Sequence, residues 1–178
     1  MGRAVPFACV LGAAAALLVP VARAGGERDV VSLFFIAKSE NRNQVHYGVH
    51  LDASCAPVGP APVFGYWRML EHGPTATEPL LAREVRAYGF AGERVMAREA
   101  QGGRVLVLLA ALAQRPIVVE TLASGSTCVA TATTAIGGVP AALGSVFAQL
   151  RWPFGVDSLT LTGRALADGH VVRERVAP

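Results

Sequence analysis

Charged residues make up only 16% of this 178-residue chain, and aromatic residues only 7%. Lys38 is the single lysine, so arginine supplies nearly all of the positive charge, and the net charge is +3. The basic residues form no long run, which argues against a nucleic-acid partner. Glycine and proline number 19 and 11 but follow no G-x-y period, which excludes a collagen-like chain. The 52% of hydrophobic residues excludes intrinsic disorder and predicts one packed domain.

Residues 1–24 have the pattern of a secretory signal peptide. Arg3 supplies a short positive segment, residues 5–21 supply an apolar one, and Ala22-Arg23-Ala24 fits the small-x-small cleavage rule. We therefore expect cleavage before Gly25 and a periplasmic or extracellular location, with an uncleaved membrane anchor as the alternative. No later apolar run approaches the ~20 residues of a spanning helix, so no transmembrane span is expected after cleavage.

Two cysteines remain after cleavage, Cys55 and Cys128. An oxidising compartment allows such a pair to form a disulfide, and closing a loop of this length would stabilise the fold by up to ~4 kcal/mol. Cysteine is also among the most buried residue types, so two separate buried thiols are the alternative. Both interpretations stay open at this point.

The mature chain, residues 25–178, shows a dominant hydrophobic period of two, which indicates a single β-rich domain. Strands are expected at residues 30–37, 44–51, 63–71, 94–101, 104–112, 117–122, 127–136, 146–150, 158–165 and 170–176. The clearest hairpin turns at Asp168-Gly169. The pattern predicts a single antiparallel β-barrel or β-sandwich of about eight strands with one short α-helix. Short connections favour an up-and-down barrel, which also removes exposed strand edges.

The helix is expected between Thr77 and Gly89. Thr77 can cap its start, and Pro79 stands early, where its missing N–H costs nothing. Leu81, Val85 and Tyr88 then form an apolar stripe at spacings of four and three.

Several short patterns lie along the mature chain: Leu33-Phe34-Phe35-Ile36, Ser39-x-Asn41-x-Asn43-x-Val45-x-Tyr47, Pro62-Val63, Tyr66-Trp67, Pro79-Leu80 and Ala87-Tyr88-Gly89. Together they resemble a family of small exported bacterial proteins, domain of unknown function 4833. The resemblance covers most of the mature chain and is strongest in its first sixty residues. It implies an exported fold and assigns no catalytic residues.

The densest polar run, residues 38–43, lies between two predicted strands. Glu40, Asn41 and Asn43 are candidate ligand-binding residues there, because binding residues collect on loops held by a rigid scaffold. An ordinary turn is the alternative, because Asn and Ser hydrogen-bond their own backbone. Trp152 and Phe154 form an aromatic loop that would either gate a pocket or close one end of the core.

Catalytic and metal signatures are weak. His46 and His50 would lie ~13 Å apart on a strand, too far to share one ion, and no zinc spacing is present. The sequence has no nucleophile elbow or phosphate-binding loop, so no metal and no cofactor are expected. Cys55 would pair with His46 or His72 only by an accident of folding. Nothing in the sequence shows that any two of the carboxylates meet, among them Glu40, Glu71 and Glu78.

Arg68 shares a predicted strand face with Phe64, Tyr66 and Leu70. If that face and Tyr47 of the neighbouring strand line a barrel, Tyr47, Tyr66 and Arg68 would surround an acidic ligand group. The alternative is a structural ion pair with Glu40, Glu71 or Asp157.

Three classes of function follow. The first is an exported, non-enzymatic protein that binds a small apolar or amphipathic molecule or an envelope partner. The second is an envelope hydrolase using a Cys/His or Glu/His pair, and the third is a structural partner in an envelope assembly. A deep pocket lined by Tyr47, Tyr66 and Arg68 would favour binding, and a filled interior with exposed apolar patches would favour assembly.

Overall fold

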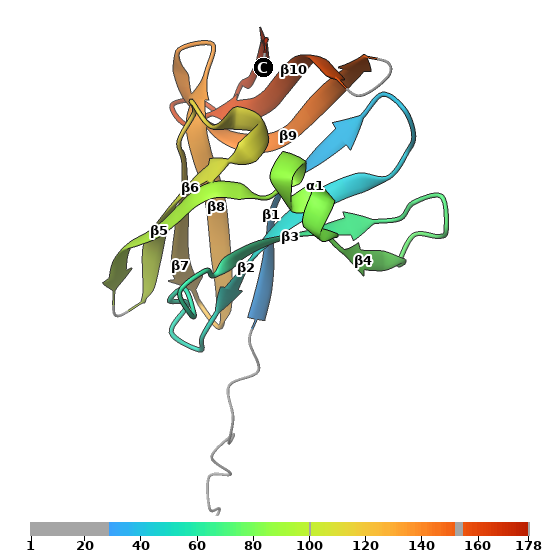
Figure 1. Cartoon of the computed structure of the whole chain (residues 1–178). Coiled ribbons are helices and arrows are strands. Elements are labelled where there is room, and N and C mark those ends of the chain that lie inside the picture. The colour runs from blue at the N-terminus through green and yellow to red at the C-terminus, as the bar shows by residue number, and fades with distance from the viewer. Residues whose placement is uncertain (1–28, 100, 152–154, 178) are drawn as a thin grey trace, which may run out of the picture.

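A computed structural model describes residues 29–99, 101–151 and 155–177 (Figure 1). The predicted signal peptide and Trp152 lie outside the described residues. The chain is mainly β, as the hydrophobic period predicts. Its strands are β1 (Asp29–Lys38), β2 (Gln44–Leu51), β3 (Val63–Arg68), β4 (Thr77–Pro79), β5 (Phe90–Glu99), β6 (Gly102–Leu109), β7 (Ile117–Ser124), β8 (Thr127–Ile136), β9 (Val139–Arg151), β10 (Gly155–Ala165) and β11 (Val171–Val176). The helices are α1 (Ala82–Tyr88) and the 3-10 turn η1 (Ala110–Leu112).

The strands form one curled sheet, which Figure 1 shows as a half-barrel rather than a closed barrel. Their order is β4-β3-β2-β1-β9-β8-β7-β6-β5, with β10 and β11 branching from β9. The expectation of about eight strands in an up-and-down barrel is therefore wrong, because the described residues form eleven strands and their sheet does not close. The two end strands fail to meet because β4 is only three residues long, Pro79 has no N–H to donate, and α1 follows at once.

Strand β9 is the junction of the sheet. Along one edge its first part pairs with β8 and its later part pairs with β1, while β10 lies along the other edge. The β1–β9 pairing is parallel, so the sheet is mixed rather than purely antiparallel. Long-range pairing of this kind leaves no local signal in the sequence.

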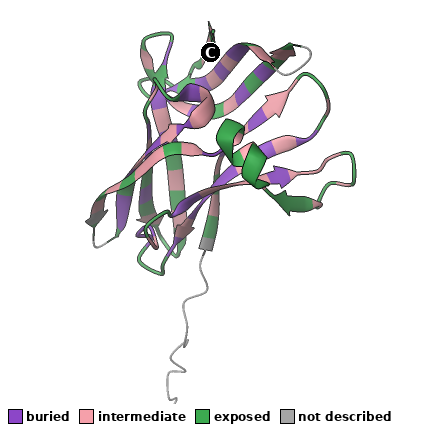
Figure 2. Ribbon diagram, viewed as in Figure 1, coloured by how far each residue is buried: buried purple, intermediate pink, exposed green. Residues whose placement is uncertain are grey.

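The interior is filled by side chains from the concave face. Val45, Tyr47, Val49 and Leu51 of β2 are completely buried, as the alternation in that strand predicts. Figure 2 shows the same alternation of buried and exposed residues along neighbouring strands, whereas α1 is mostly exposed. The core therefore belongs almost entirely to the sheet.

Side-chain contacts join the two ends of the half-barrel. A disulfide joins Cys55 of the β2–β3 loop to Cys128 of β8. The carboxylate of Glu93 on β5 accepts a hydrogen bond from the backbone N–H of Val63 on β3, at 2.9 Å. The hydroxyl of Tyr47 donates to the carbonyl oxygen of Tyr88, at 2.6 Å. These contacts take the place of the missing strand pairing.

The helix begins later than expected. Residues 77–79 form β4, where Pro79 lies opposite Tyr66, and the first helical residue is Ala82. The carboxylate of Glu84 accepts a hydrogen bond from the free N–H of Leu81, which stabilises this first turn. Leu81 and Val85 remain about half exposed, so the predicted stripe is not buried as a whole. No helix in the described part of the chain is long and apolar enough to cross a membrane.

Candidate ligand-binding site

The predicted constellation around Arg68 is not formed. The register of β2 and β3 places Tyr47 opposite Gly65, so Tyr47 points into the core while Tyr66 and Arg68 lie on the convex face. A side chain at position 65 would lie 3.2 Å from the Tyr47 ring, which explains the glycine there. The guanidinium of Arg68 donates to the carbonyl oxygen of Pro74 and forms no ion pair with an acidic residue in the described ranges.

An aromatic strip covers part of the convex face of β1, β2 and β3. Its five rings follow one another with centroids 4.3 to 6.0 Å apart: Phe35, His46, Tyr66, Phe64 and His50. Burial, together with the charge of Arg68, lowers the pKa of His46, so its imidazole is neutral at physiological pH. Within the described residues, no group of three or more His, Cys, Asp or Glu side chains is placed to hold a metal ion.

The disulfide removes Cys55 as the nucleophile of the predicted hydrolase. Because Cys55 is bonded to Cys128, it has no thiol to attack a substrate.

The carboxylate of Glu71 accepts a hydrogen bond from the side-chain amide of Asn43, and the backbone N–H of Glu71 donates to the amide oxygen of the same Asn43 side chain. Asn43 is buried, and its two hydrogen bonds with Glu71 hold the loop in place. The side-chain oxygen of Asn41 accepts a hydrogen bond from the backbone N–H of Asn43. The side chain of Glu40 is exposed.

An apolar groove of about 500 Å³ lies between α1, η1 and the hairpin of β10 and β11. Its apolar walls come from small and medium-sized side chains, and Arg86, Gln114 and Arg115 add polar groups. We call this hollow the apolar groove; it is lined by Arg86, Ala87, residues 110–115, Val156, Leu159, Val176 and Ala177. Its volume lies within the ~300–1,000 Å³ of small-molecule sites.

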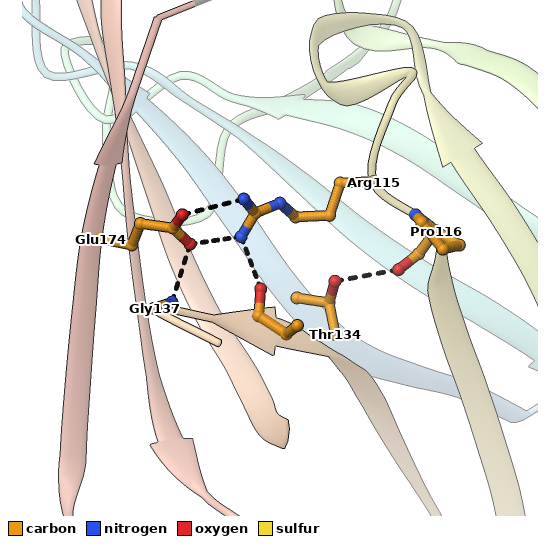
Figure 3. A network of polar contacts seen from close by, with 6 residues as sticks. Arg115, Pro116, Thr134, Gly137 and Glu174 are labelled. Carbon is orange, nitrogen blue, oxygen red and sulfur yellow. Dashed lines mark hydrogen bonds and ion pairs between the residues drawn. The ribbon is translucent and has the colours of Figure 1, made fainter. Parts of the chain in front are cut away.

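A bidentate ion pair fixes one side of the apolar groove. The guanidinium of Arg115 faces the carboxylate of Glu174 on β11, and it also donates to the carbonyl oxygen of Ala135 (Figure 3). The N–H of Gly137 donates to the same carboxylate, at 2.8 Å. These bonds tie the segment after η1 to the β8–β9 turn and to β11, so this wall is held before any ligand arrives.

Replacing Glu174 with glutamine is expected to lower the free energy of unfolding by ~2 kcal/mol at neutral pH. The hydrogen bonds from Arg115 and Gly137 lower the pKa of Glu174 from 4.5 to about 2. This contribution is fully present above pH 4.5 and is lost as the pH falls towards 2. Urea unfolding across that range should show the difference between wild type and variant closing.

Asp157→Asn is the matched control, because Asp157 pairs with Arg175 in the same hairpin but both side chains are largely exposed. Its loss should stay below ~1 kcal/mol. Equal losses for the two variants would contradict a special role of Glu174.

Sequence reasoning missed the apolar groove. Its central wall, residues 110–113, reads Ala-Ala-Leu-Ala, which continues an apolar run and carries no binding signal. Of the predicted site residues, the structure brings Asn41 and Asn43 to one polar hollow. It leaves Tyr47 buried in the core and Tyr66 and Arg68 on the convex face. Trp152 is outside the described residues.

The fold and the groove define a mainly β protein built on one curled sheet with a filled interior and a surface hollow. A family model for the domain of unknown function (DUF4833) matches residues 34–175, and the chain belongs to that family. The match confirms the resemblance found in the sequence. Searches of curated proteins and of solved structures gave no match.

Proposed function

We propose that this chain is an exported protein that binds a small amphipathic acid in the apolar groove. The single observation that carries the proposal is the size and composition of that groove, about 500 Å³ with mostly apolar walls. A hollow with apolar walls and a few polar groups is the usual form of a small-molecule site. The filled interior excludes a ligand at the centre of the half-barrel, so the ligand binds at this surface.

The charges beside the groove favour an acidic head group. Arg115 is already neutralised by Glu174. Arg86 lies on the exposed side of α1 and forms no ion pair with any acidic residue in the described ranges. A ligand carboxylate would therefore meet Arg86, whose planar guanidinium suits it, while an alkyl chain would lie along the alanines of η1.

Two features support export. Residues 1–24 have the signal-peptide pattern described above. The Cys55–Cys128 disulfide is of the kind that persists in oxidising compartments and is rare in the cytosol.

Assembly with an envelope partner is the second candidate function. Leu122 and Val129 lie opposite each other on β7 and β8 and are 52% and 40% exposed. Exposed apolar pairs of this kind occur at protein interfaces, but two residues make only a small patch. The apolar groove is the larger feature and carries the first proposal.

A titration with dansyl-labelled undecanoic acid tests the proposed function. The wild-type protein should enhance the probe's fluorescence, and Arg86→Gln should weaken binding about tenfold because one charged hydrogen bond is lost. Arg83→Gln removes an exposed arginine from the same helix, outside the groove, and should bind as the wild type does. The corresponding dansyl-labelled alcohol should not distinguish the two variants. Equal binding of the acid by Arg86→Gln and Arg83→Gln would contradict the assignment.

A further inference from the structure

A second hollow of about 240 Å³ lies at the other end of α1, and we call it the polar cleft. The end of β1, the loop after it, β3, β4 and the start of α1 all contribute to it. Its polar side chains are those of Lys38, Asn41, Asn43, Glu78 and Glu84. It shares no lining residue with the apolar groove.

The walls of the polar cleft are held by bonds behind them. Asn43 is fixed by its two hydrogen bonds with Glu71, and Asn41 accepts the N–H of Asn43 at 3.1 Å. On the other side, the indole N–H of Trp67 donates to the carboxylate of Glu84, at 2.9 Å. A site whose side chains are already oriented loses little entropy when a ligand binds.

Opposite charges line the cleft without pairing with each other. The ammonium of Lys38 lies 4.7 Å from the centre of the Trp67 ring. None of the ion pairs among the described residues joins Lys38 to Glu78 or Glu84. Partial burial would raise the pKa of Glu84. The hydrogen bonds from Leu81 and Trp67, together with the positive charges of Arg83 and Lys38, lower this pKa overall, so the group is a carboxylate at neutral pH.

We propose that the polar cleft binds a small zwitterion of the amino-acid type. The ligand carboxylate lies at Lys38 and at the side-chain amide of Asn41, and the ligand ammonium lies at Glu78. The apolar part of the ligand packs against Met69 and Leu81, which also line the cleft.

The charge balance favours a zwitterion over an ion of one sign. An anion alone would face two carboxylates, Glu78 and Glu84, and a cation alone would be repelled by Lys38. A zwitterion gives Lys38 and Glu78 each a partner of opposite sign, while Glu84 already accepts the indole N–H of Trp67. The cleft is smaller than the ~300 Å³ at which sites for drug-sized ligands begin, so it suits a single amino acid better than a lipid or a folded partner.

Calorimetric titration of the full mature protein with a panel of free amino acids tests this proposal. At least one should bind, leucine being the first choice because of the apolar wall. Isocaproate lacks the ammonium group and isoamylamine lacks the carboxylate, so each should bind about tenfold more weakly than leucine. No binding by any free amino acid, or binding of either analogue as tight as that of leucine, would overturn the proposal.

Two variants locate the site. Lys38→Met and Glu78→Gln should each weaken the binding of the amino acid about tenfold. Lys38→Met also removes the contact with Trp67, so Glu78→Gln, which keeps the shape of the side chain, is the decisive variant. Glu99→Gln is the control, an exposed carboxylate on β5 outside the cleft. Unchanged affinity in Glu78→Gln would exclude this site, whereas retained amino-acid binding in Arg86→Gln would separate the polar cleft from the apolar groove.

Discussion

Replacing Cys128 with serine is expected to lower the free energy of unfolding by about 4 kcal/mol. The disulfide joins residues separated by 73 positions and so closes a long loop in the unfolded chain. Without the bond the unfolded chain has a higher conformational entropy, which stabilises the unfolded state. The bond also connects the β2–β3 loop to β8 across the open side of the half-barrel, where no strand pairing replaces it. Denaturation with urea, under conditions that keep the wild-type disulfide oxidised, measures the loss.

Reduced wild-type protein is the control for this variant. Dithiothreitol should lower the stability of the wild type to nearly that of Cys128→Ser and leave the variant unchanged. If both thiols of the unreduced wild type are alkylated in denaturant, or if dithiothreitol changes nothing, the cross-link makes no such contribution.

Replacing Tyr47 with alanine should cost about 4 kcal/mol, the second large effect. Tyr47 is fully buried, stacks on Phe34 with ring centroids 4.6 Å apart, and meets the edge of Phe90. Its hydroxyl also donates to Tyr88, the last residue of α1. Tyr47→Phe removes only that hydrogen bond and should cost about 1 kcal/mol.

Tyr66→Ala is the matched control for Tyr47→Ala, because Tyr66 lies one strand away on the convex face and is only partly buried. It should cost less than half as much in the same chemical denaturation. Equal losses would mean that Tyr47 and Tyr66 do not face opposite sides of the sheet, which would contradict the pairing of Tyr47 with Gly65.

The sequence predicts a strand best where one face of that strand is buried and the other is exposed to solvent. β2 and β8 begin and end at the predicted residues, because apolar and polar positions alternate along them. β9 is thirteen residues long, but only residues 146–150 were expected, since Pro140, two alanines and Gly144 hide its period. β4 has three exposed residues and includes Pro79, so no pattern marks it as a strand.

The candidate sites depend on register, which a single sequence does not specify. Alternation places Tyr47 and Tyr66 correctly within their own strands, but only the pairing of Tyr47 with Gly65 shows that they face opposite sides. The polar run at residues 38–43 indicates the polar cleft in part, because Asn41 and Asn43 line it. Its other polar groups, Glu78 and Glu84, come from a strand and a helix whose positions depend on the fold.

Filling the apolar groove with a bulky side chain tests whether a ligand binds there. Ala87 lines the groove from α1, whereas Ala82 of the same helix is also exposed but lies outside the groove. In the titration with dansyl-labelled undecanoic acid, Ala87→Phe should bind at least about tenfold more weakly than the wild type, because its ring fills the groove. Ala82→Phe should bind as the wild type does. Wild-type affinity in Ala87→Phe, with the fold intact by circular dichroism, would show that the acid does not bind in the apolar groove.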